Sequence, residues 1–130
     1  MRKIFLVDKD SEFRSSVESL LRTVIDIAGV NGEFDFVHLN DSEDFKGSLR
    51  SGNGGYVNSL TITDQVKVVR LAKVVQSSPI FYDEGFNFQS RGIKAVRYGA
   101  VAYFGKRNAN DEVFFMDKAR EILQNGSNPH

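Results

Sequence analysis

The sequence contains no cysteine and only two histidines, His38 and His130. Without cysteine the chain can form no disulfide bond, no thiolate metal site and no catalytic thiol. Two histidines are too few for the histidine clusters that bind zinc or copper. Disulfide-stapled folds, thiol enzymes and histidine-rich metal sites are therefore excluded before any pattern is considered.

An excess of either charge sign is also missing, because 17 basic side chains balance 17 acidic ones. A general nucleic-acid or membrane-surface binder needs a basic excess, so we expect neither partner. No apolar run approaches the roughly 18 residues of a membrane span, and the first seven residues are too short for a signal peptide. We expect one cytoplasmic domain over residues 1–126, followed by a frayed tail over 127–130.

Short apolar stretches alternate with segments that have helical spacing. The strands are predicted at residues 4–7, 34–39, 56–63, 79–82 and 100–104, and the helices at 11–29, 42–49, 66–75, 89–98 and 110–126. The run at 4–7 is apolar on both faces, which is typical of a central strand in a covered parallel sheet. This alternation predicts an α/β fold, with a five-stranded parallel sheet covered by helices on both faces in a flavodoxin-like three-layer sandwich.

In such sheets the ligand site lies beyond the carboxyl ends of the strands. The residues at these ends are the triplet Asp8-Lys9-Asp10, Asp64, the pair Asp83-Glu84, and Lys106. Carboxylates facing a lysine suit a magnesium ion and a phosphoryl anion, because Mg²⁺ prefers carboxylate and water oxygens. The glycine-rich loops of nucleotide and dinucleotide sites and the Gly-x-Ser-x-Gly turn of hydrolases are missing, which argues against those classes.

Residues 3–14 and 94–106 carry the pattern of a known family. The first segment contains a strand, an acidic turn and a helix start, and the second contains a helix, a strand and a terminal lysine. Together they resemble the receiver domains of two-component response regulators, and the resemblance extends over essentially the whole chain. It implies the flavodoxin-like fold, signal transduction, and no enzymatic activity beyond the domain's own phosphotransfer.

Three residues match functional positions of that family. Asp8 matches the first magnesium-binding acid, Lys106 the lysine that binds the phosphoryl group, and Tyr103 the aromatic residue that reports the switch. The resemblance also implies a phosphoacceptor aspartate after the third strand. Asp64 follows the predicted strand, but counting back from Glu84 places the acceptor near residues 56–58, where no carboxylate occurs. Asp64 alternatively reads as an acid in the first turn of the next helix, with Thr63 as the cap.

Other positions depart from the family pattern. Lys9 stands where the second acid is expected, with Asp10 one residue later, and its charge should repel a metal cation. Glu84, or Asp83 in the neighbouring register, stands where a neutral hydroxyl is expected, and its charge should repel a phosphoryl group. These changes predict a cluster of ion pairs in which lysine replaces the metal.

The main hypothesis is therefore a degenerate receiver, or pseudo-receiver, which acts through protein–protein contacts and is not switched by phosphate. Its partners would be a sensor kinase or a downstream signalling protein, and the fourth helix, fifth strand and fifth helix would also serve a homodimer. The alternative is a phosphoacceptor receiver that uses Asp64, with Asp8 and Asp10 for Mg²⁺ and Lys106 for the phosphoryl group. A flavin-binding module is a third hypothesis, which the charges of residues 8–10 disfavour.

Overall fold

The structure is a computed structural model, and it describes residues 1–52, 55–83, 88–106 and 111–127. Strands and helices alternate along the chain, as the sequence predicts. In order they are β1 (Arg2–Val7), α1 (Ser11–Ala28), β2 (Phe34–Leu39), α2 (Ser42–Ser51), β3 (Leu60–Thr63), α3 (Val66–Val74), β4 (Ser78–Asp83), α4 (Phe88–Arg97), β5 (Ala102–Gly105) and α5 (Asp111–Ser127).

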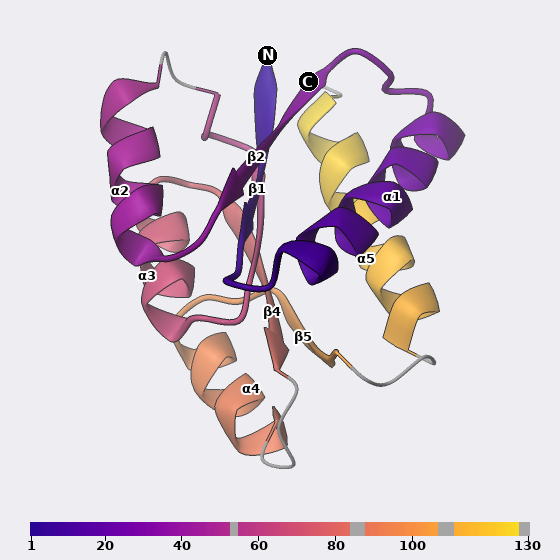
Figure 1. The fold of residues 1–130 in the computed structure, drawn as a ribbon. Coiled ribbons are helices and arrows are strands. Elements are labelled where there is room, and N and C mark those ends of the chain that lie inside the picture. Colours follow the sequence, from indigo (N-terminus) through magenta and orange to yellow (C-terminus); the bar gives the residue numbers. More distant parts are fainter. Residues whose placement is uncertain (53–54, 84–87, 107–110, 128–130) are drawn as a thin grey trace.

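The strands form one parallel sheet in the order β2-β1-β3-β4-β5. Helices α1 and α5 cover one face, and α2, α3 and α4 cover the other (Figure 1). Strand β1 lies between β2 and β3, and its residues Ile4–Val7 are buried, while β2 is an edge strand. The predicted three-layer fold with a parallel five-stranded sheet is confirmed.

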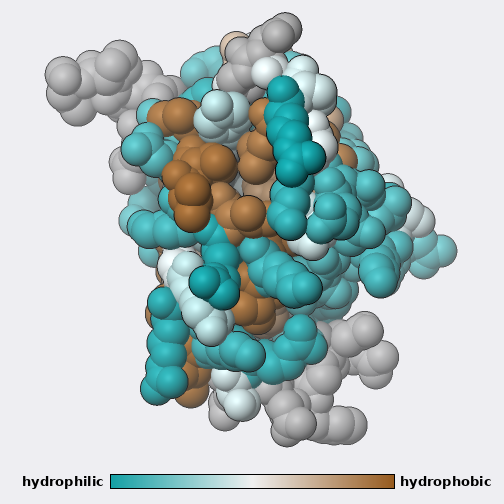
Figure 2. Space-filling view, turned by 90° about the vertical axis from the view of Figure 1, so that its left-hand side faces the viewer, coloured by the Kyte–Doolittle hydropathy of each residue, from teal (hydrophilic) through white to brown (hydrophobic). Residues whose placement is uncertain are grey.

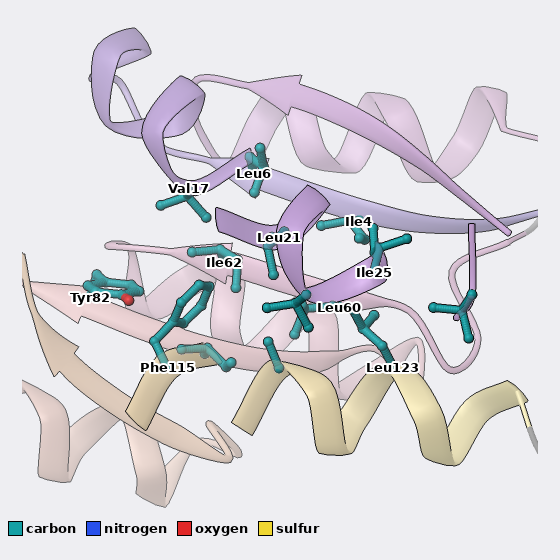
Figure 3. Close-up of a cluster of buried hydrophobic side chains, with 14 residues drawn as sticks. Ile4, Leu6, Val17, Leu21, Ile25, Leu60, Ile62, Tyr82, Phe115 and Leu123 are labelled. Atoms are coloured by element: carbon teal, nitrogen blue, oxygen red, sulfur yellow. The ribbon is translucent and has the colours of Figure 1, made fainter. Parts of the chain in front are cut away.

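Each face of the sheet has its own apolar core. Strands β1 and β3 meet α1 and α5 in the larger core, to which Ile4, Leu6, Leu60, Ile62, Val17, Leu21, Ile25, Phe115 and Leu123 belong (Figure 3). On the opposite face Phe5 and Phe45 meet edge to face, with ring centroids 5.1 Å apart. Full burial of each such side chain contributes about 1.5–3 kcal/mol, so these two layers hold the helices against the sheet.

The ends of α1 follow from local chemistry. The Asp10 side chain accepts hydrogen bonds from the backbone N–H groups of Glu12 and Phe13, which caps the amino terminus. Gly29 ends the helix with φ at 73°, a left-handed conformation that glycine adopts without steric cost. The predicted limits of this helix are therefore confirmed.

The region around β3 corrects two expectations. The strand predicted over 56–63 is reduced to Leu60–Thr63, because the backbone turns at Asn58, where φ is 62°. Thr63 does not cap α3. It stays in the strand, its hydroxyl accepts a hydrogen bond from the Gln65 N–H at 3.1 Å, and Gln65 is the cap residue. Asp64 thus precedes the helix, and its reading as a first-turn acid is wrong.

Smaller differences occur at other ends. Strand β4 extends to Asp83, so this carboxylate belongs to the strand, and β5 starts at Ala102 rather than at residue 100. Helix α5 runs to Ser127, one residue into the segment expected to fray, and residues 128–130 lie outside the described residues. Within the described ranges, no helix is both long and apolar enough to cross a membrane.

Candidate functional site

Four charged residues from distant parts of the sequence meet at the carboxyl edge of the sheet. Asp8 follows β1, Asp64 follows β3, Asp83 ends β4 and Lys106 follows β5. Parallel pairing aligns these ends, since Val7 pairs with Thr63 and Asp83 pairs with Gly105. The backbone N–H of Lys106 also donates to the Asp83 carbonyl at 2.9 Å. The edge that the sequence singled out is therefore one cluster in space.

The closest contact in this cluster joins Asp8 and Lys106. Lys106 Nζ lies 2.6 Å from Asp8 Oδ2, and the two side chains are only 8% and 4% exposed. Asp8 Oδ1 accepts a hydrogen bond from the Asp10 N–H at 2.9 Å. The lysine ammonium also lies over the Phe13 ring, 4.4 Å from its centroid. Both charges are removed from water, so each depends on the other for compensation.

Asp64 also lies near Lys106, and it is more exposed to solvent than Asp8. Its Oδ2 is 3.6 Å from Lys106 Nζ, and its side chain is 31% exposed. Asp64 Oδ1 is buried and has no hydrogen-bond partner among the described residues. Burial, and next the charge of Asp8, raises the pKa of the Asp64 carboxyl, while Lys106 lowers it only in part. Two carboxylates thus compete for one ammonium group.

The other two residues of the acidic turn, Lys9 and Asp10, are exposed. The Asp10 carboxylate caps α1. Within the ranges that the structure describes, no group of three or more histidine or acidic side chains could hold a metal ion. Of the two predicted magnesium ligands, Asp8 is therefore paired with Lys106, and the Asp10 carboxylate is engaged as a helix cap.

Asp83 forms a second ion pair at this edge. Its Oδ1 lies 3.2 Å from a guanidinium nitrogen of Arg91 on α4, and the Asp83 side chain is 8% exposed. The other terminal nitrogen of Arg91 donates to the Asp64 carbonyl at 3.3 Å. Arg91 therefore joins α4 to the ends of β3 and β4. Glu84, the other candidate for the hydroxyl position, lies outside the described residues.

Tyr103 on β5 packs against α4 at Gly92. A Cβ atom added at Gly92 would lie 2.2 Å from Cδ2 of the Tyr103 ring, so only glycine allows this approach. The half-buried ring belongs to the core formed by Val69, Phe81 and Ala95. The sequence pointed to Tyr103 but gave no sign of its contact with Gly92.

Sequence reasoning missed two arginines of the site. These are Arg91, whose contacts are given above, and Arg14 on α1. The Arg14 guanidinium donates to the carbonyls of Asp8 and Leu39 and to Asn40 Oδ1. These contacts fix the loops that follow β1 and β2. The helical spacing of the sequence does not predict these contacts, because the long side chains of both arginines bind residues on other elements.

Comparisons with known proteins point to one fold. No family model matches the chain, and no curated protein matches it. Among solved structures, the receiver domain of AraT from Geobacillus stearothermophilus superposes with a TM-score of 0.68 at 14% identity, covering 98% of both chains. A signal receiver domain from Bermanella marisrubri gives 0.65 at 17% identity over 93% of this chain and 97% of that one.

Full-length FixJ from B. japonicum gives a TM-score of 0.64 at 18% identity. The match covers 95% of this chain but only 58% of FixJ, so this chain spans little more than half of that regulator. At these identities the likeness lies in the fold. The chain has the fold of response regulator receiver domains.

Proposed function

We propose that this protein is a receiver-type signalling module that acts through protein–protein contacts and is not switched by phosphate. The observation that carries the proposal is the buried pair between Lys106 and Asp8, 2.6 Å apart. A metal-dependent phosphate switch needs surplus negative charge at this point. Here the lysine compensates the charge of Asp8, and Asp64 alone adds surplus negative charge beside the pair.

The second ion pair supports the same proposal. Arg91 neutralises Asp83 and holds α4 at the carboxyl edge through the Asp64 carbonyl. The Asp83 carboxylate would repel an incoming phosphoryl group, whereas a neutral hydroxyl at this position would donate a hydrogen bond to it. The contacts between α4 and the sheet therefore do not depend on a bound anion, and the surface that α4 presents is constant.

The docking surface in this proposal lies on α4 and the turn after it. Ile93, Val96, Tyr98 and Val101 are between 38% and 51% exposed. Lys94 and Arg97 lie on the same helix and are also exposed. Apolar side chains among cations suit an acidic protein surface, such as that of a sensor kinase, a downstream signalling protein or a second copy. The module is not an enzyme in this scheme.

A magnesium titration of stability tests the proposal. A ligand that binds only the folded state stabilises that state by RT ln(1 + [L]/Kd), so the unfolding temperature rises with ligand concentration. We expect no rise for the parent protein with millimolar Mg²⁺, with or without a phosphate analogue. The variant Lys9→Asp places a carboxylate beside Asp8 and should gain a measurable rise. A metal-dependent rise in the parent that Asp64→Asn abolishes would contradict the proposal.

One observation favours a second candidate, the phosphoacceptor receiver. Asp64 follows β3, is partly exposed, lies 3.6 Å from Lys106, and has one carboxylate oxygen without a described partner. That function would require Mg²⁺ to displace Lys106 beside Asp8. Mass spectrometry after treatment with acetyl phosphate distinguishes the two candidates. A phosphoryl mass gain that Asp64→Asn removes supports the phosphoacceptor, and an unchanged mass supports the proposal above.

A further inference from the structure

Residues of α2 and α3 line a groove. These two helices lie on the face of the sheet opposite α1 and α5 (Figure 1). The groove has a volume of about 310 Å³. It is lined by Ser42 and Lys46 from α2 and by Lys67, Arg70, Leu71 and Val74 from α3. No residue of the carboxyl-edge cluster and none of the α4 docking surface lines it.

Two of the residues that line the groove, Leu71 and Val74, are apolar. Val74 is 80% exposed, more than any other large apolar side chain that the structure describes, and Leu71 lies one turn before it on α3. Residues three apart are neighbours on a helix surface. Single exposed apolar residues are ordinary, but this pair lines a concave surface, which is where apolar side chains of a partner can be buried.

The walls of the groove are basic. Lys46 pairs with Glu43 at 3.2 Å, and the Arg70 guanidinium lies over the Tyr98 ring. Among the described residues, neither Lys67 nor Arg70 has a carboxylate within 4.0 Å. Figure 2 looks onto this side of the molecule, where apolar side chains gather between long hydrophilic ones. The groove thus has positive charge beside apolar side chains.

We propose that this groove docks an acidic amphipathic helix of a partner protein. Apolar side chains spaced three and four residues apart on that helix would cover Leu71 and Val74. Carboxylates flanking them would pair with Lys67 and Arg70, and like charge would reject a basic helix. Helices α2 and α3 line the groove and α4 does not, although the two surfaces meet where Arg70 lies over the Tyr98 ring.

Fluorescence anisotropy with two labelled synthetic peptides tests the proposal. One is a helical peptide with leucines at i, i+3 and i+7 flanked by glutamates, and the other carries lysines in place of the glutamates. We expect the full-length protein to bind the acidic peptide and not the basic one, with affinity falling as salt rises. Val74→Ser and Lys67→Glu should each lower the affinity for the acidic peptide roughly tenfold or more.

Matched surface variants serve as controls. Ile27→Ser on α1 and Arg120→Glu on α5 change exposed side chains elsewhere and should leave peptide affinity unchanged. Circular dichroism establishes that Val74→Ser and Lys67→Glu remain folded, as expected for exposed positions. The proposal is overturned if the acidic peptide does not bind, if both peptides bind equally well, or if the groove variants leave the affinity unchanged.

Two other occupants are outcomes of the same test. Self-association that rises with protein concentration and disappears in Lys67→Glu would assign the groove to a second copy instead. Binding to phosphatidylglycerol vesicles that needs Lys67 and Val74, without binding of the acidic peptide, would assign it to an anionic lipid surface. Either result replaces the protein helix as occupant and contradicts the proposal.

Discussion

The ammonium of Lys106 lies 2.6 Å from the carboxylate of Asp8, and both side chains are buried at the carboxyl edge of the sheet. Asp8 is the first residue after β1, and Lys106 is the first residue after β5, so 97 intervening residues must fold before the pair can form. Because neither charge is compensated by water, this pair determines how the pocket responds to mutation.

Removing one member of this pair should destabilise the protein strongly. Lys106→Met leaves the Asp8 carboxylate buried without a cation, and we expect a loss of about 3–5 kcal/mol in the free energy of unfolding. The double variant Asp8→Asn, Lys106→Met removes both charges and should recover a large part of that loss. Urea unfolding measures both effects, and strictly additive losses would show that the two residues are not coupled.

Asp64 should make stability depend on pH. Its pKa is raised in the folded state, so the folded protein binds the proton more tightly than the unfolded chain. Ionisation therefore costs stability as pH rises from the ordinary aspartate pKa of about 3.9 through the raised value. Asp64→Asn cannot ionise, and its stability relative to the parent should increase across this window. Unfolding midpoints measured against pH test this, and a relative stability of Asp64→Asn that falls as pH rises would contradict the assignment.

Gly92 should be intolerant of a side chain. Alanine normally stabilises a helix relative to glycine by about 0.5–1 kcal/mol. At Gly92, however, the new Cβ would overlap the Tyr103 ring, so we expect Gly92→Ala to lower the free energy of unfolding. Gly47→Ala on α2 is the matched control, because nothing lies within 4 Å of the added atom, and it should be stabilising. Similar results for the two variants would refute the Tyr103 contact.

Asp10 should behave as a helix cap rather than as a metal ligand. Asp10→Ala removes the acceptor for the Glu12 and Phe13 N–H groups and should cost about 0.5–2 kcal/mol. Asp10→Asn keeps an acceptor oxygen and should stay close to the parent in thermal unfolding. Neither variant should change the response to Mg²⁺. A magnesium stabilisation in the parent that Asp10→Asn removes would show a metal role instead.

The sequence by itself determined the fold class and the location of the site. The apolar run at Ile4–Val7 predicts a central strand, Asp10 and Gly29 mark the ends of the first helix, and strand ends are adjacent in any parallel sheet. These features depend on local chemistry and on the period of the apolar pattern. They could therefore be read without coordinates, as could the positions of Asp8 and Lys106 at the carboxyl edge.

Only the tertiary structure decided which side chains meet. The placement of Asp64 beside Lys106 depends on the short β3 strand, whose start is set by the turn at Asn58. Separate elements are joined by the partners of Arg91, by the contact of Tyr103 with Gly92, and by the groove that Val74 helps to line. Local patterns carry no information on such contacts, since they depend on how the packed sheet and helices position their side chains relative to one another.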